Sequence, residues 1–257
     1  MIFKFILLGS GSSVGVPKID GNFGDCDQKN KKNYRTRCSA LIKLNDKNIL
    51  IDTSPDLRQQ LLLNKIKSID SVLYSHLHAD QTHGINDLRT FFLKNKKKIP
   101  IYADKKTAKY LYSTFKYCFK STLDYPAMLK LNKLKKNLTF MNKNKKITIS
   151  CIPVKHGNLD SICFIINNKL AYASDANLIY KKNLISFMNL KYLVIDCLRY
   201  KYHPSHYNLD QVLDLIKIIK PKKTILTNLN ADLDYKKLKN ILPKNIFPGF
   251  DGMTFSI

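Results

Sequence analysis

The six histidines of this 257-residue chain are confined to three short clusters, and each cluster follows a segment whose apolar residues predict a β-strand. This placement constrains the fold, because separate strands must end close together if the histidines are to act as one group. The clusters are His76, His78 and His83 after the segment 71–75, His156 after a segment ending at 154, and His203 with His206 after a segment ending at 196.

The residues at these predicted strand ends are typical metal ligands. His76 and His78 are separated by one residue, so both imidazoles can project to the same side and reach one cation, and Asp80 adds a carboxylate oxygen beside them. Asp175 follows another predicted strand, 169–174. Four separate strand ends that each supply a ligand-type residue predict a metal site built by the tertiary fold. For His83 or His203 alone, a purely structural imidazole is the better interpretation.

Strand and helix patterns alternate along the whole chain, and no linker or internal repeat divides it. We therefore expect one domain, residues 1–257, of the α/β class, with two mixed β-sheets packed together and helices outside. The Lys-rich stretch 116–146 is expected to form a loop or short helices that cover the site. The predicted strands are 2–8, 39–44, 48–52, 71–75, 99–102, 147–154, 161–166, 169–174, 192–196 and 224–227. The predicted helices are 55–64, 84–92, 105–115, 178–188, 209–219 and 235–240.

Charge and composition narrow the function classes. The 44 basic and 19 acidic residues give a net charge of +25, which favours anionic partners such as nucleic acid. Because 39 of the basic residues are Lys and every acidic residue is Asp, we favour a compositional bias spread over the chain, with nucleic acid as the weaker interpretation. The absence of Glu excludes a Glu general base. No membrane span or secretory leader is readable, and the six scattered cysteines suit a cytoplasmic protein.

Beyond this local chemistry, the sequence resembles the metallo-β-lactamase fold superfamily, whose H-x-H-x-D-H signature is matched from His76 to Asp80, with Gln81 in place of the last histidine. More narrowly, it is similar to the branch that contains the phosphoribosyl cyclic phosphodiesterase of phosphonate breakdown and, more distantly, ribonuclease Z. The resemblance implies a four-layer αββα sandwich. The supporting stretches are Gly9-Ser10-Gly11-Ser12-Ser13, Arg35-Thr36-Arg37-Cys38-Ser39, Asp52-Thr53-Ser54-Pro55-Asp56, Gly84-Ile85-Asn86-Asp87, His203-Pro204-Ser205-His206 and Asp232-Leu233-Asp234-Tyr235.

This resemblance also implies roles for the site residues. His76, His78 and His156 would hold one metal ion, and Asp175 would bridge to a second. Asp80 would bind the second ion and could protonate the leaving oxygen. His206 would contact the scissile phosphate as an electrophile or acid.

Two departures from the family pattern concern the second ion. Gln81 and Asn228 stand where the family and this branch have histidines, and each would offer a metal ion only a weakly binding amide oxygen. We therefore expect Zn²⁺ or Mn²⁺ at one firm site and weaker binding at a second. Arginine is rare in this chain, so Arg35, Arg37 and Arg199 are candidates for contacts to substrate phosphate.

The function favoured by these features is that of a metal-dependent phosphodiesterase acting on a small cyclic or nucleotide-like phosphodiester through metal-activated water. Two alternatives remain open. One is an RNA-processing endonuclease of the ribonuclease Z type, and the other is a non-catalytic scaffold with a degenerate second metal site. The branch resemblance also implies a homodimer.

Overall fold

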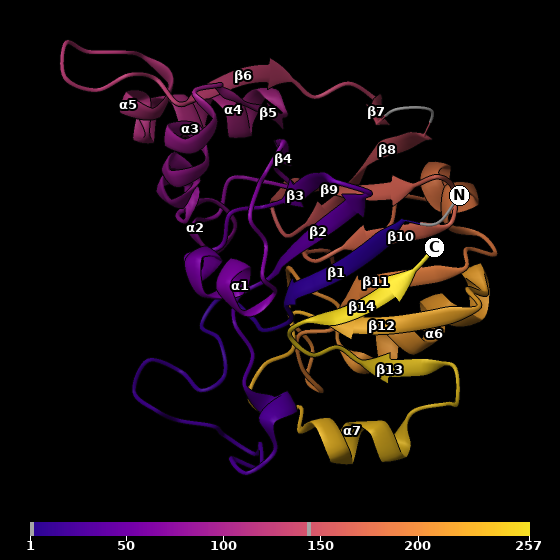
Figure 1. The fold of residues 1–257 in the computed structure, drawn as a ribbon. Coiled ribbons are helices and arrows are strands. Elements are labelled where there is room, and N and C mark those ends of the chain that lie inside the picture. Colours follow the sequence, from indigo (N-terminus) through magenta and orange to yellow (C-terminus); the bar gives the residue numbers. More distant parts are fainter. Residues whose placement is uncertain (1–2, 143–144) are drawn as a thin grey trace.

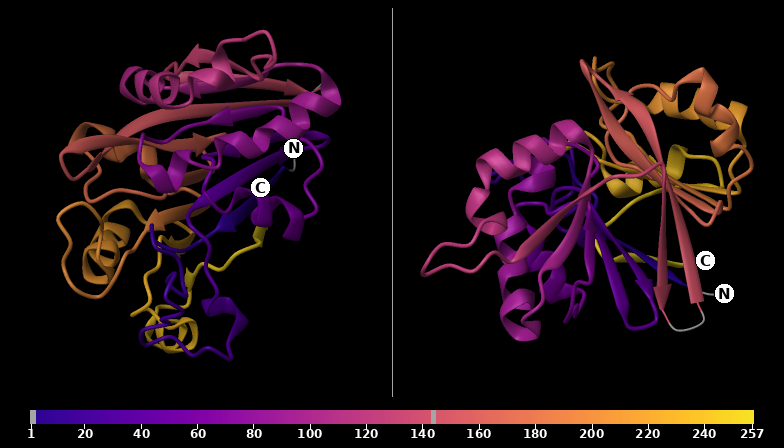
Figure 2. Two further views of the ribbon diagram at one scale, coloured as in Figure 1. Left: turned by 90° about the vertical axis from the view of Figure 1, so that its left-hand side faces the viewer. Right: turned by 90° about the horizontal axis from the view of Figure 1, so that it is seen from above.

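The structure is a computed structural model that describes residues 3–142 and 145–257. Within these ranges the chain forms two seven-stranded sheets that pack against each other, and helices cover the outer faces (Figures 1 and 2). The expected αββα sandwich with two mixed sheets is confirmed. Residue 2, where the first strand was expected to begin, lies outside the described residues.

The first sheet has the strand order β14-β1-β2-β3-β4-β5-β6. Its pairs are antiparallel from β14 to β3 and parallel from β3 to β6. The strands are β14 (Met253–Ser256), β1 (Lys4–Gly9), β2 (Ser39–Leu44), β3 (Lys47–Ile51), β4 (Ser71–Leu73), β5 (Ile99–Ala103) and β6 (Leu129–Lys133).

The second sheet repeats this change of direction, with the order β13-β12-β11-β10-β9-β8-β7. Its pairs are parallel from β13 to β10 and antiparallel from β10 to β7. The strands are β13 (Ile246–Pro248), β12 (Lys223–Thr227), β11 (Tyr192–Asp196), β10 (Leu170–Ala173), β9 (Leu159–Ile166), β8 (Lys145–His156) and β7 (Asn137–Asn142).

Alternation along the strands divides the apolar side chains between layers. In β2, Ile42 packs between the two sheets, whereas its neighbour Leu41 packs beneath the helices of the first sheet. In β9, Phe164 lies between the sheets and Cys163 lies under the helices of the second sheet. Both faces of these central strands are buried, which explains their nearly continuous apolar sequences.

Helices close the two outer faces of the sandwich (Figure 2). The capping box of Asn208 and Gln211 starts α6, whose buried residues Val212, Leu215 and Ile219 form one apolar stripe. Each helix within the described residues is too short or too polar to cross a membrane. The helices are α1 (Leu57–Leu63), α2 (Ala79–Thr82), α3 (Arg89–Asn95), α4 (Lys105–Thr114), α5 (Lys116–Phe119), α6 (Leu209–Ile219) and α7 (Tyr235–Ile241), with 3₁₀ segments η1 (Lys31–Asn33), η2 (Ile85–Leu88) and η3 (Lys181–Phe187).

Sequence patterns failed at the sheet edges. The stretch 116–146, expected to be a loop or short helices, also contains β6 and β7, and neither β13 nor β14 was expected. β13 and β14 have only three and four residues, β6 bears exposed lysines, and β7 begins and ends with Asn, so the hydrophobic pattern of these edge strands is weak. The helix expected over 178–188 is the 3₁₀ segment η3.

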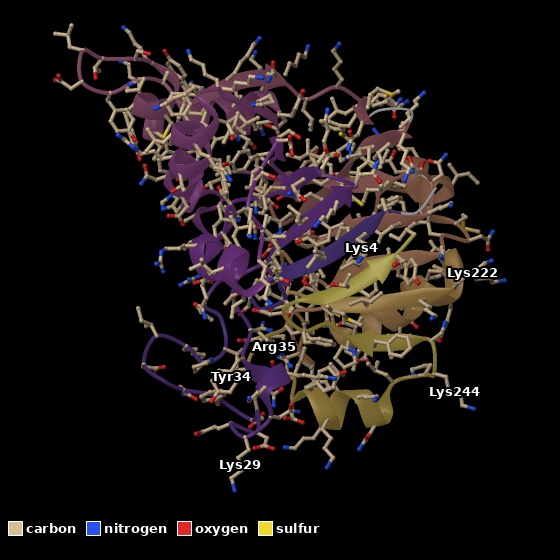
Figure 3. All side chains as sticks on the ribbon, viewed as in Figure 1. Lys4, Lys29, Tyr34, Arg35, Lys222 and Lys244 are labelled. Carbon is tan, nitrogen blue, oxygen red and sulfur yellow. The ribbon has the colours of Figure 1, made fainter. Side chains whose placement is uncertain are left out.

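Lysines project from much of the surface, as Lys4, Lys29, Lys222 and Lys244 do in Figure 3. The charge is not evenly spread, however. Residues 85–136, which include β5, β6 and the helices α3, α4 and α5, contain 14 basic residues and three Asp, or +11 of the net +25. The expectation of an evenly distributed charge is corrected for this region.

Candidate metal centre

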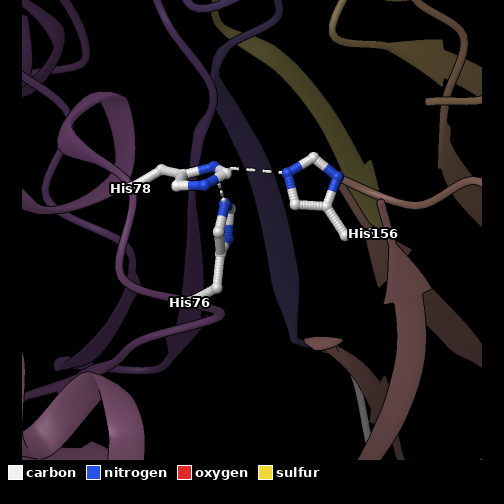
Figure 4. A group of neighbouring side chains, drawn as sticks. All are labelled: His76, His78 and His156. Carbon is white, nitrogen blue, oxygen red and sulfur yellow. Dashed lines mark hydrogen bonds between the residues drawn. The ribbon is translucent and has the colours of Figure 1, made fainter. Parts of the chain in front are cut away.

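The residues of the predicted site meet at one edge of the sandwich, where strands of both sheets end. The loop after β4 carries His76 and His78, and β8 ends at His156 from the other sheet (Figure 4). Asp175 follows β10 at the same edge. β8 and β10 flank β9 in one sheet and β4 belongs to the other, so the packing of the two sheets brings together residues that are far apart in sequence.

Three imidazole nitrogens converge in this centre. Nε2 of His76 lies 3.0 Å from Nδ1 of His78, and Nε2 of His156 lies 3.2 Å from the same Nδ1 (Figure 4). A tetrahedral zinc ion with Zn–N bonds of about 2.0–2.1 Å separates its ligand nitrogens by about 3.3 Å. The distances from His78 to the other two nitrogens are therefore close to those of such a coordination shell, and ligand atoms of all three residues lie within 4.8 Å of one another.

A hydrogen bond leaves Nε2 of His156 with a lone pair, and burial favours the neutral form of all three imidazoles. Nδ1 of His156 lies 2.7 Å from the carbonyl oxygen of Ser205, which can only accept, so the proton is on Nδ1 and Nε2 is free. Burial lowers the pKa of His76 to about 3, and it also lowers the pKa of His78 and of His156. Neutral imidazoles with inward lone pairs fit a divalent transition-metal ion.

Two carboxylates line the other side of the centre. Burial, followed by the nearby Asp175, raises the pKa of Asp80 to about 6. Burial alone would raise the pKa of Asp175 too, but the neighbouring imidazoles of His76 and His156 lower it. The buried amide of Gln81 donates from Nε2 to Asp80 at 3.2 Å and to Asp175 at 3.3 Å.

The third histidine cluster supplies an ion pair. Nδ1 of His206 donates to Oδ2 of Asp196 at 2.6 Å. Burial opposes the charge on His206, but Asp196 outweighs it and the pKa of His206 rises to about 9. Burial raises the pKa of Asp196 to about 7, and we favour the ionised carboxylate, because it also accepts from the backbone N–H of Ala176 and from the amide of Asn228. Ligand atoms of His156, Asp175 and His206 lie within 4.8 Å of one another, so His206 faces the same centre.

The remaining two histidines do not belong to these groups of ligand atoms among the described residues, although the ring of His203 packs against His206 with ring centroids 5.0 Å apart. Nε2 of His83 is 2.9 Å from the hydroxyl of Tyr110 on an exposed surface. His203 accepts at Nδ1, 3.1 Å from the Ser205 hydroxyl. Both placements agree with a structural interpretation of these residues.

The predicted phosphate-binding arginines are not gathered at the centre. The side chain of Arg35 is 2 % exposed, and its guanidinium donates to the carbonyl oxygens of Asn230 and Leu233. Its prediction as a phosphate contact is wrong, because its guanidinium is buried and cross-links the loop to the 230–233 segment.

Arg37 and Arg199 are more accessible, and their role as phosphate contacts stays a prediction. Arg37 pairs with Asp56 at 2.8 Å and lines a surface cavity of about 570 Å³. Arg199 donates to the carbonyl oxygens of Lys201 and Tyr202, and it thereby shapes the loop that leads to His203.

Sequence reasoning did not assign the residues that orient these ligands. Asp196, Ser205 and Asp52 were not assigned roles, although Asp52 accepts from the backbone N–H of Ser75 at 2.7 Å, next to His76. The one available signal was position, since Asp52 and Asp196 are aspartates at the ends of apolar strands. The hydrogen bond from His156 to the Ser205 carbonyl could not be read from side-chain types.

The two-sheet sandwich with a candidate metal centre at its strand ends defines the class of fold. Residues 47–227 match the family model described as a beta-lactamase superfamily domain. The chain therefore belongs to this superfamily and has the metallo-β-lactamase fold.

Solved structures give similar relatives. A diphosphatase from the PhnP family is 30% identical, with a TM-score of 0.89, over 100% of this chain and 98% of that one. Zn²⁺-bound PqqB from Methylobacterium extorquens is 16% identical with a TM-score of 0.76, over 98% of this chain and 99% of that one. The short form of human tRNase Z is 15% identical with a TM-score of 0.69, over 98% of each chain. The last two show the fold alone.

A curated relative from Porphyromonas gingivalis (strain ATCC BAA-308 / W83) is named octanoyltransferase. It is 34% identical over 256 residues, which is 97% of this chain and 51% of that protein. The chain thus spans about half the length of the relative, and the name describes the longer protein.

Proposed function

We propose that this protein is a metal-dependent phosphodiesterase that hydrolyses a small cyclic or nucleotide-like phosphodiester. The observation that carries the proposal is the convergence of three imidazole lone pairs beside His206, whose Nδ1 is paired with Asp196. The first group can hold a cation, and the second can hold a proton. The similarity to a diphosphatase of 30% identity over the full length supports phosphate chemistry in particular.

The metal ligands in this proposal are His76, His78 and His156, with Asp175 beside them. A bound Zn²⁺ or Mn²⁺ would lower the pKa of a coordinated water and withdraw charge from the phosphoryl group. The chain fixes the direction of each nitrogen. Ser205 holds the His156 ring through its carbonyl oxygen, and the Ser75 hydroxyl lies 3.0 Å from Nδ1 of His76.

Protonated His206 is the proposed acid. Asp196 holds its Nδ1–H, so the second proton, on Nε2, is available to the leaving oxygen of the substrate. The raised pKa keeps this proton bound at neutral pH. Asp80 is a second acid candidate, since burial and Asp175 raise its pKa to about 6 and increase the protonated fraction near that pH.

The proposal is tested by hydrolysis of bis(p-nitrophenyl) phosphate with metal-stripped protein reconstituted with Mn²⁺ or Zn²⁺. We expect turnover that requires the added metal and that is lost in Asp80→Ala and His206→Ala. Folded protein that binds one ion and hydrolyses no phosphodiester with either metal would contradict the proposal. The name of the Porphyromonas relative adds a control, since hydrolysis of octanoyl esters under the same conditions would indicate acyl chemistry.

RNA processing is the second candidate, and one observation favours it. Residues 85–136, which include β5 and β6, carry +11 of the net charge of +25. A surface that binds a polyanion such as RNA concentrates positive charge in this way. Binding of RNA that weakens steeply between about 50 and 200 mM salt would support this candidate. Phosphodiester turnover that does not change with salt, without measurable RNA binding, supports the small substrate.

A further inference from the structure

We infer that the centre is built for a single metal ion, because the side-chain amide of Gln81 takes the place that a second ion would need. This inference rests on the metal centre of the proposed function. The residue types of Gln81 and Asn228 alone predict weak ligands of that ion. The hydrogen bonds of both amides indicate instead that their N–H groups bind the carboxylates in place of a second ion.

The first observation is the direction of the Gln81 amide. Gln81 is fully buried, and its Nε2 lies between two carboxylates, 3.2 Å from Oδ2 of Asp80 and 3.3 Å from Oδ2 of Asp175. An ionised carboxylate only accepts hydrogen bonds, so the NH₂ group is the end of the amide that belongs there. Two N–H groups thus bind the same two oxygens that would ligate a second cation.

Rotating the amide does not make Gln81 a good ligand. Oε1 is buried and has no hydrogen-bond partner among the described residues. A rotation that turned Oε1 toward a cation would break both hydrogen bonds from Nε2, to Asp80 and to Asp175. The present orientation keeps two donors paired and leaves only one acceptor unpaired.

Asn228 is also occupied. Its Nδ2 donates to Oδ1 of Asp196 at 3.1 Å and lies 3.0 Å from Nδ1 of His206. This amide therefore belongs to the Asp196–His206 pair. Gln81 and Asn228, which replace family histidines, therefore both donate N–H groups to carboxylates. An imidazole at either position could instead present a lone pair to a metal ion.

The decisive measurement is the number of ions bound per chain. Metal-free protein is titrated with Zn²⁺ and with Mn²⁺ by isothermal calorimetry, and the content after gel filtration is measured by mass spectrometry. We expect one tightly bound ion in the wild type. Wild-type protein that binds two ions with affinities within tenfold would overturn the inference, whereas protein that binds none would overturn the proposed metal centre itself.

Two variants test the role of Gln81. Gln81→Glu has nearly the same shape but replaces the NH₂ group with an oxygen, and Gln81→His restores the imidazole of the family signature. We expect each to bind a second ion, and we expect Mn²⁺ to raise the melting temperature of Gln81→Glu more than that of the wild type. If Gln81→His does not fold, Gln81→Glu with excess Mn²⁺ still decides the question.

Gln59→His is the matched control, because Gln59 is exposed on α1, outside the centre, and receives the same new imidazole. It should bind one ion, like the wild type. A folded Gln81→Glu or Gln81→His that still binds one ion would show that the amide is not what excludes the second, and it would overturn the inference.

Discussion

The imidazole side and the carboxylate side of the centre differ in what their atoms offer to a cation. On the first side, Nε2 of His76 and Nε2 of His156 lie 3.0 and 3.2 Å from Nδ1 of His78. On the second side, the oxygens of Asp80 and Asp175 already accept hydrogen bonds from Gln81. Residues with potential metal ligands stand at strand ends on both sides of the centre. The hydrogen bonds of their side chains decide which of these ligand atoms can bind a metal ion.

The largest expected effect comes from breaking the imidazole side. His78→Ala removes the nitrogen that lies nearest to both of the others, and we expect metal affinity to fall at least about 100-fold and kcat/KM at least about 1,000-fold. Calorimetric Zn²⁺ titration and phosphodiester hydrolysis measure these losses. His83→Ala is the control from the same segment, since His83 contacts Tyr110 on an exposed surface, and it should retain the ion. Full metal content in His78→Ala would contradict the assigned ligand set.

A smaller effect should separate proton delivery from metal binding. His206→Ala is expected to lower kcat by about 10² to 10⁴, because it removes the proposed acid but none of the three converging nitrogens. The metal content, measured by mass spectrometry, should stay at the wild-type level. His83→Ala, whose ring contacts Tyr110 on an exposed surface, is the control and should have nearly wild-type kcat. Loss of the ion from His206→Ala would instead identify His206 as a ligand.

The charge state of His206 can be measured directly in metal-free protein. Its pKa is raised to about 9, so the imidazole should remain protonated at pH 7 and lose its proton as the pH rises through about 9. Titration by NMR of the ring resonances follows this step. Asp196→Asn removes the negative partner and should lower the His206 pKa toward or below about 6.5. An unchanged midpoint in that variant would contradict the assigned pairing.

The smallest expected effect concerns the turn that holds His156. Gly157 has a φ of +60°, and a Cβ there would lie 2.8 Å from Cβ of Ser205. Gly157→Ala should destabilise the fold by about 1–3 kcal/mol and weaken metal binding, because it displaces the loop whose carbonyl orients His156. Thermal unfolding and metal titration measure both effects.

Gly21→Ala is a suitable comparison for that variant. Gly21 also has a positive φ, of +81°, but nothing lies within 4 Å of an added Cβ. It should show the backbone strain without the loss of metal affinity. Equal metal affinities in the two variants would show that the contact with Ser205 does not orient His156.

Local sequence was sufficient for some parts of the fold and not for others. The strands β2, β8 and β9 were predicted because their apolar residues form strong patterns. Edge strands β6, β7, β13 and β14 were missed, because a strand that is short or partly solvated needs no such pattern. Arg35 was misassigned for a related reason, since the 230–233 segment that buries it lies about 200 residues away.

The sequence by itself determined the chemistry available to the centre. It specified nitrogen ligands at His76, His78 and His156, carboxylates at Asp80 and Asp175, and amides at Gln81 and Asn228. A residue type fixes which atoms can donate a proton or a lone pair, and this property does not depend on the fold.

Only the tertiary structure decided how these atoms are used. It turned the lone pair of His156 inward by placing the Ser205 carbonyl behind the ring, and it paired His206 with Asp196. It also directed the NH₂ group of Gln81 at two carboxylates. The physical reason is that the direction of a proton or lone pair depends on the partner it meets, and several of these partners come from distant strands that are joined only when the two sheets pack.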